Sequence, residues 1–168
     1  MKKLKKIKFI KQIPYIYYME IPPIDYDLIA HLATQTCVPE IIIRELFQYA
    51  KKQIIHMTNN HCHFAVIYRK TKVHAFGMNQ YRKGIHVHAE VDAINNLLPH
   101  PKGRVLKKVK LLVIRLTRKL HLLSDSKCCI KCCEAIYKVP PLRGYTIETV
   151  SFSTSRDTIE DHHPISLL

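Results

Sequence analysis

The spacing of apolar residues predicts two helices and then two strands in the first half of the chain. In residues 39–52 the apolar side chains recur three and four positions apart, as on one face of an amphipathic helix, and Pro39 suits its first position. A shorter helix is predicted over residues 26–33. Residues 62–68 and 72–78 have the composition and length of strands, and the short polar segment between them predicts a turn.

The second half continues with helices and strands in alternation. Residues 109–116 and 144–152 form mostly apolar runs of strand length. Two helices are predicted from apolar residues at helical spacing, which are Val91, Ile94 and Leu98 in one and Cys132 and Ile136 in the other. Helices that alternate with strands cover both faces of one sheet, so we expect a three-layer α/β/α sandwich with a mixed central sheet. Residues 153–168 leave open whether a further strand or helix follows.

Residues that suit metal binding and proton transfer stand at the predicted starts of the two later helices. His88 and Glu90 form an H-x-E pair, and Cys129 and Cys132 form a C-x-x-C pair. One histidine and two thiolates can hold zinc and leave its fourth tetrahedral position open. Glu90 is not needed as a ligand and can therefore carry protons. His86 is a rival ligand, because residues two apart share a face in an extended segment.

These motifs resemble the zinc-dependent cytidine and deoxycytidylate deaminase family. Residues 88–94 read HAEVDAI, the form usual in that family, and residues 126–132 read SKCCIKC where the family usually has Ser-Lys-Pro-Cys-x-x-Cys. Cys128 thus replaces a proline that would fix the backbone before the helix. The resemblance covers residues 62–154 and implies a sandwich of the cytidine-deaminase type.

The same resemblance implies a zinc-dependent hydrolytic deaminase that converts a cytosine base to uracil and releases ammonia. It assigns Zn²⁺ to His88, Cys129 and Cys132, and it makes Glu90 the catalytic proton carrier. Cytosine is favoured over adenine, because residues 124–129 do not resemble the Thr-Leu-Glu-Pro-Cys segment of tRNA adenosine deaminases. A nucleoside, a nucleotide and a polynucleotide all stay open as the substrate.

Two substrate-binding residues follow from the resemblance. Asn79 matches a Gly-x-Asn that the family often carries on the strand leading to the active site, and its amide can both donate and accept hydrogen bonds. A turn asparagine is the structural alternative. Ala89, inside the HAE segment, is the second candidate.

The remaining cysteines are predicted to be structural. Cys128 and Cys133 flank the chelating pair and are expected to be buried thiols, and Cys37 and Cys62 are interpreted as core residues. Disulfides are not expected, since nothing in the sequence indicates secretion. A redox or metal-sensing cluster over residues 128–133 is an alternative, although such a cluster needs no neighbouring glutamate.

The charge indicates which partners to consider. The net charge is +14, from 27 Lys and Arg against 13 Asp and Glu. Basic residues concentrate in residues 1–11 and in residues 102–119, a segment without an acid. Such clusters attract polyanions, so single-stranded nucleic acid or an acidic partner is a candidate, with a solvated surface as the alternative. We divide the chain into a basic, Tyr- and Pro-rich N-terminal arm, residues 1–38, and a deaminase-like domain, residues 39–168.

Hydropathy and composition also bear on location. No uncharged apolar run reaches the roughly 20 residues of a membrane span, and lysines interrupt the apolar part of the N-terminal segment before it reaches the length of a signal-peptide core. These features predict an intracellular protein, in the cytoplasm or the nucleus. The chain is also similar to small deaminase-like proteins, some of them from large DNA viruses, for which the virion is a further location. A catalytically silent deaminase fold that binds nucleic acid or assembles into a particle is the alternative function, and a homo-oligomer is left open.

Overall fold

A mixed β-sheet forms the centre of the molecule, which is known from a computed structural model. The structure describes residues 23–55, 61–82, 84–101, 105–117, 120, 123–154 and 158–167. The predicted basic cluster of residues 1–11 lies outside them, as do residues 102–104 and 118–119 of the second basic cluster. The described strands of this sheet are β1 (His61–Arg69), β2 (Lys72–Met78), β5 (Lys107–Thr117), β6 (Leu123–Ser124), β7 (Tyr145–Ser153) and β8 (Ile159–His162). Their order is β2-β1-β5-β7-β8, and β6 pairs with β5. β5 and β7 run parallel, and the other paired strands run antiparallel.

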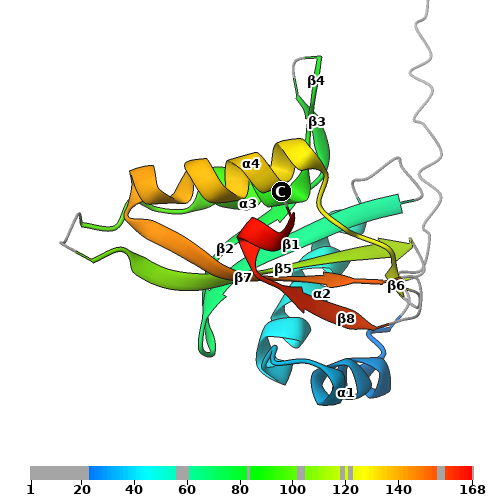
Figure 1. Cartoon of the computed structure of the whole chain (residues 1–168). Helices are drawn as coiled ribbons and strands as arrows, with labels where there is room; N and C mark the ends of the chain where they lie inside the picture. The colour runs from blue at the N-terminus through cyan, green and yellow to red at the C-terminus, as the bar shows by residue number, and fades with distance from the viewer. Residues whose placement is uncertain are drawn as a thin grey trace, which may run out of the picture.

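Helices cover both faces of this sheet (Figure 1). The described α-helices are α1 (Tyr26–Gln35), α2 (Glu40–Ile54), α3 (Ala89–Asn96) and α4 (Ile130–Lys138). α1 and α2 share one hydrophobic core with the sheet, and α3 and α4 share the other. This arrangement confirms the predicted three-layer α/β/α sandwich with a mixed sheet. The chain after β7 adds both kinds of element, since the short helix Pro164–Leu167 follows β8.

The core under α1 and α2 is filled with large apolar side chains. Leu46 and Phe47 of α2 are fully buried against the sheet, and Ile29 and Leu32 of α1 are fully buried in the same cluster. Asp25 caps α1 by accepting a hydrogen bond from the backbone N–H of Leu28 at 2.9 Å. α1 is therefore packed with α2 against the same face of the sheet.

On the other face, α3 lies very close to β2. A Cβ atom on Gly77 would lie 2.2 Å from the backbone nitrogen of Ala93 and 2.3 Å from the carbonyl oxygen of Ala89. Only glycine permits this approach, since real Cβ atoms do not come so near to backbone atoms. Asp92 adds polar links, because its carboxylate accepts hydrogen bonds from the Met78 backbone N–H at 3.1 Å and from Gln80 Nε2 at 2.6 Å.

Three local features differ from the sequence-based expectations. A hairpin of β3 (Gln80–Arg82) and β4 (Ile85–Val87), which was not predicted, projects from the body of the molecule (Figure 1). α3 ends at Asn96, so the prediction that Leu98 belongs to its buried face is wrong, and Leu98 is 76% exposed. Pro99 follows directly and disfavours helical backbone at the residue before it. The prediction that Cys37 lies in the core is also wrong, because Cys37 is exposed and the next side chain, Val38, is buried instead.

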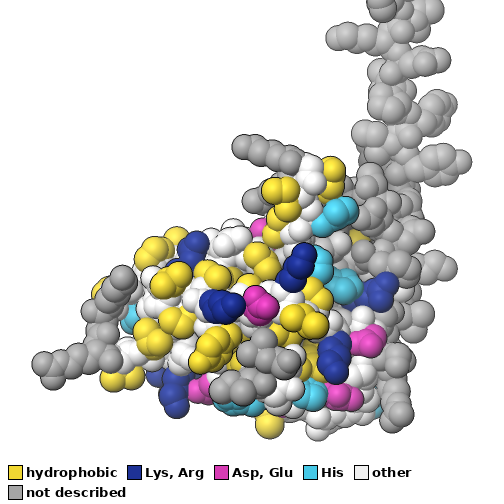
Figure 2. Space-filling model, turned by 45° about the horizontal axis from the view of Figure 1, so that its top comes forward, with side chains coloured by type: hydrophobic (Ala, Val, Ile, Leu, Met, Phe, Trp, Pro, Cys, Tyr) yellow, Lys and Arg dark blue, Asp and Glu magenta, His cyan; other side chains and the backbone are white. Residues whose placement is uncertain are grey.

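The outer surface of α3 and α4 is mixed in character. Figure 2 shows hydrophobic side chains interspersed with charged ones on this face. The large exposed apolar residues in these elements and next to them are Leu98, Ile130, Tyr137 and Leu142. Within the described residues, no helix has both the length and the apolar character needed to cross a membrane.

Candidate metal centre and adjoining pocket

His88, Cys129 and Cys132 come together in the structure although the histidine is far from the cysteines in sequence. His88 Nδ1 lies 3.6 Å from Cys129 Sγ and 3.2 Å from Cys132 Sγ, and the three potential ligand atoms all lie within 4.8 Å of one another. Zinc–nitrogen and zinc–sulfur bonds of about 2.0 and 2.3 Å at tetrahedral angles place such atoms about 3.5 Å apart. The donor set and its spacing therefore fit a zinc ion.

The starts of two helices hold these three residues. His88 is the N-cap of α3, Cys129 is the N-cap of α4, and Cys132 lies in the first turn of α4. Unpaired N–H groups give each helix start a partial positive charge, which is favourable for anionic groups placed there. The two helix starts are adjacent because α3 and α4 lie side by side on the same face of the sheet (Figure 1).

A buried hydroxyl fixes the loop that leads to Cys129. Ser126 Oγ donates a hydrogen bond to the carbonyl of Val113 at 2.9 Å, and the Ser126 N–H donates to the carbonyl of Ser153 at 2.9 Å. Ser126 thereby connects this loop to both β5 and β7. The first cysteine ligand candidate thus begins its helix from a point fixed to the centre of the sheet.

Glu90 lies in the first turn of α3, next to the cysteines. Its side chain is buried, with the residue only 2% exposed, and Oε2 has no hydrogen-bond partner among the described residues. A buried carboxylate oxygen without a partner is costly, because it loses its hydration without compensation. This oxygen is therefore suited to a ligand, a water molecule or a proton that the protein itself does not provide.

Burial also affects the thiols around Glu90. Burial raises the pKa of the Cys132 thiol, and the neighbouring Glu90 carboxylate raises that pKa further. The pKa of Cys128 is raised by the same two causes in the same order. Several buried acids that share one site cannot all ionise without a cation. A divalent metal would relieve this conflict, which is a second sign that the site fits zinc.

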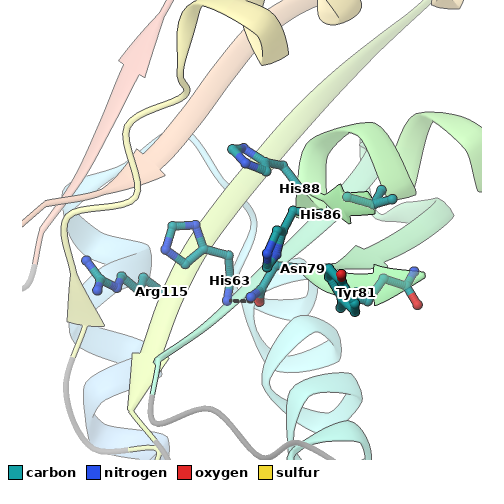
Figure 3. A pocket seen from close by; sticks show the side chains of 8 residues that line it. His63, Asn79, Tyr81, His86, His88 and Arg115 are labelled. Atoms are coloured by element: carbon teal, nitrogen blue, oxygen red, sulfur yellow. Dashed lines mark hydrogen bonds between the residues drawn. The ribbon is translucent and has the colours of Figure 1, made fainter. Parts of the chain in front are cut away.

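A pocket of about 300 Å³ adjoins the candidate metal centre. Figure 3 shows His63 between Arg115 on one side and Asn79 and His86 on the other, with His88 above them. His63 of β1 and Arg115 of β5 are direct cross-strand neighbours in the sheet. Among the described residues, those that line the pocket include no carboxylate. Its polar lining is therefore neutral or cationic.

Asn79 lies where β2 passes into the hairpin, and it lines this pocket. Its Oδ1 accepts a hydrogen bond from the backbone N–H of His63 at 2.7 Å, and its own backbone N–H donates to the His63 carbonyl at 3.1 Å. With Oδ1 engaged in this way, a ligand in the pocket would meet Asn79 through the Nδ2 donor. Ala89 is fully buried, and its carbonyl faces Gly77.

His63 and Arg115 were not singled out from the sequence, because neither belongs to a recognisable motif. On this face of the sheet their strands otherwise present Ala65 and Val113 to the core. A polar residue at the end of an alternating apolar strand is only a weak sign of a binding site. It becomes informative once the strand register shows which other polar residue lies beside it. Arg115 Nε is buried and has no hydrogen-bond partner among the described residues.

The remaining candidates fall outside the cluster of ligand atoms. His86 is exposed and lines the pocket, and its ring lies 4.8 Å from that of Tyr81. Cys128 and Cys133 are buried thiols, and Cys62 is buried in the core under α2. The described cysteines form no disulfide.

Comparisons with known proteins give a distant likeness. No family model matches the sequence, and no curated protein matches it. Among the solved structures that match is the dCMP deaminase of the cyanophage S-TIM5 in its apo form, at 13% identity and a TM-score of 0.40. The match covers 66% of this chain and 81% of the cyanophage chain. So distant a likeness does not establish a substrate, and the chemistry of the site follows from its own residues.

Proposed function

We propose that this chain is a zinc-dependent hydrolytic deaminase, which converts a cytosine base to uracil and releases ammonia. The observation that carries the proposal is the position of Glu90. This glutamate is buried beside three potential metal ligands and has one unpartnered oxygen. A purely structural zinc site needs no such group, whereas hydrolysis of an amidine needs a proton carrier at this place.

His88, Cys129 and Cys132 would hold the zinc ion. When bound, zinc supplies the Lewis acidity that makes water nucleophilic near neutral pH. Glu90 would accept a proton from the attacking water and deliver it to N3 of the cytosine ring. A second transfer to the amino group at C4 lets that group leave as ammonia, so cytosine and water become uracil and ammonia.

The adjoining pocket would receive the rest of the substrate. Its volume of about 300 Å³ lies at the lower end of the range for small-molecule sites, about 300–1,000 Å³. The Nδ2 group of Asn79 would donate to the base or the sugar. His63 and Arg115 supply the further polar contacts on the sheet side of the pocket.

A Glu90→Gln variant tests the assigned chemistry. It removes the proton carrier but no ligand, so the protein should keep about one zinc per chain while turnover falls by a factor of about 10² or more. Metal analysis and ammonia release measure the two properties on the same preparation, with cytidine, dCMP and a cytosine-containing oligonucleotide as substrates. Loss of zinc from this variant would make Glu90 a ligand and overturn the mechanism.

Adjacent cysteines provide matched controls for the ligand set. Cys132→Ser should lose zinc and lower thermal stability, because ligand energy contributes to folding. Cys133→Ser, one residue away and equally buried, should keep the metal. Equal zinc content in the two variants would contradict the proposed set.

Cys128 favours a second candidate function, a catalytically silent fold used for nucleic-acid binding or assembly. This buried thiol stands where the family usually has proline, and it interacts with Glu90. A thiol that keeps the carboxylate engaged would leave a metal-binding protein without turnover. Zinc at one equivalent, together with no ammonia release from any of the three substrates, would support the silent fold. Recovery of turnover in Cys128→Pro would identify this thiol as the cause.

A further inference from the structure

The structure brings together two groups of basic residues that are separated in the sequence. Arg69, Lys70 and Lys72 lie at the β1–β2 turn, and Lys107, Lys108 and Lys110 lie at the start of β5. The two groups are close together because of the strand register, in which Tyr68 of β1 pairs with Lys110 of β5. We call these six residues the basic end of the sheet.

The basic end extends over both faces of the sheet. A hollow of about 350 Å³ on the α2 side is lined by Arg69, Lys70, Lys108 and Lys110, among others. A second hollow of about 240 Å³ lies on the other side, where Lys72 and Lys107 join Arg69 and Lys70. The two hollows therefore share Arg69 and Lys70 and meet at the turn.

Little acidic charge opposes these cations. Among the described residues that line the two hollows, Glu148 is the acidic one, and its carboxylate lies 3.8 Å from Lys108 Nζ. The pKa of His74 responds to this field. Burial lowers that pKa first, and the positive charges of Lys107, Lys72 and Arg69 lower it further. Cations from both groups are therefore close enough to influence the same side chain, His74.

The basic end is separate from the candidate metal centre. The β1–β2 turn and the β3–β4 hairpin lie at opposite ends of β2 (Figure 1). A strand of this length spans about 20 Å at roughly 3.3 Å per residue. A ligand at the basic end therefore does not need the pocket beside His88.

We propose that the basic end is a binding surface for the phosphate backbone of single-stranded nucleic acid. The six cations are divided between two hollows on either side of the sheet, so together they match a ligand that carries charge at regular intervals. A single phosphate at the shared residues Arg69 and Lys70 would leave the outer lysines of both hollows without a ligand, whereas successive phosphates of one strand can contact them as well. This surface does not depend on the proposed deaminase activity.

The test compares two double variants with equal loss of charge. Lys70→Gln with Lys72→Gln removes two cations of the basic end, and Lys51→Gln with Lys52→Gln removes two cations from the last turn of α2. Binding of a fluorescent oligo-dT to the full chain is measured by anisotropy over a range of salt concentrations. This probe contains no cytosine, so it is not a substrate for the proposed activity. Thermal unfolding of each variant confirms that it is folded.

The turn variant should bind more weakly and should have a flatter salt dependence. Each lost contact to a single strand lowers the slope of log K against log salt by about 0.7, so the expected change is about 1.4. The α2 variant should keep the wild-type slope. Equal slopes in the two variants would overturn the proposal. A loss of binding to phosphatidylserine vesicles with unchanged oligo-dT binding would also overturn it, in favour of a membrane surface.

Discussion

The two faces of the sheet share the same strands but differ in how closely their helices approach and in the polar groups they bury. The face under α1 and α2 is covered by large apolar side chains such as Leu46 and Phe47. The face under α3 and α4 also has large apolar residues such as Leu111 in its core, but it includes the small Ala65, and α3 packs directly against Gly77 of β2. It also buries polar groups, of which Glu90 and Asp92 are the acidic ones.

This difference suggests a division of roles, in which the α1–α2 face mainly contributes stability and the α3–α4 face holds the candidate site. Large side chains under α2 bury much apolar area, which is the main favourable term in folding. On the other face, the absence of a side chain at Gly77 lets the α3 backbone approach the sheet closely. That approach sets the positions of His88 and Glu90 relative to the cysteines of α4. We therefore expect changes on the two faces to affect different properties.

Gly77→Ala should have the largest effect. The new Cβ would meet backbone atoms of α3 at 2.2 and 2.3 Å, so the helix has to move. We expect a loss of about 4 kcal/mol or more in the free energy of unfolding, together with weaker zinc binding by the molecules that remain folded. Chemical denaturation and zinc titration measure the two effects. Gly84→Ala is the control, because its φ of +82° costs about 1–2 kcal/mol without a backbone clash.

Phe47→Ala should come next, and it should affect stability alone. Phe47 is fully buried under α2, and truncation of such a side chain costs about 3–5 kcal/mol. The zinc affinity of the folded fraction should stay at the wild-type value. A parallel loss of zinc affinity would show that the two faces are coupled and would contradict the separation.

Ser126→Ala should have a moderate effect on both properties. It removes the hydroxyl that donates to the Val113 carbonyl, at a cost of about 1–3 kcal/mol for the buried acceptor. Zinc affinity should fall with it, since this residue fixes the loop before Cys129. Ser166→Ala, which removes an exposed hydroxyl that donates to the His163 carbonyl, should change neither quantity.

His74→Gln should have the smallest effect, visible only as a change in pH dependence. The folded state lowers the pKa of His74 below its ordinary value of 6.5, so the unfolded chain takes up this proton first as the pH falls. Above pH 6.5 the histidine is neutral in both states and does not oppose folding. As the pH falls below 6.5, the unfolded chain binds the proton more tightly, so the free energy of unfolding decreases. The variant should lose less stability than the wild type between pH 7.5 and 5.5, as measured by chemical denaturation. An identical pH profile would contradict this role.

Much of the fold could be predicted because the decisive signals are local. Apolar spacing located α1, α2 and four of the long strands, and Pro39 marked the start of α2. The spacing of His88, Glu90, Cys129 and Cys132 indicated a shared site because each pair stands at the start of a helix. In these cases neighbouring residues in the sequence carry the whole pattern.

The features that were missed depend on contacts between distant segments. The β3–β4 hairpin has three-residue strands, which are too short to show an alternating pattern. His63 and Arg115 become neighbours only through the register of β1 with β5. The same register joins the lysines of β5 to the β1–β2 turn, which appeared in the sequence as an ordinary polar turn.

The connection between the hairpin and the candidate metal centre has a thermodynamic consequence. Val87 ends β4 and Ala89 begins α3, so His88 alone joins the two elements. Tyr81 and His86 of the hairpin line the pocket together with His88. A ligand that displaced the hairpin would therefore also move the His88 imidazole. Ligand binding in the pocket and metal binding at His88 would therefore be linked equilibria. If a ligand in the pocket changed the affinity for a metal at His88 by some factor, the metal would change the affinity for that ligand by the same factor.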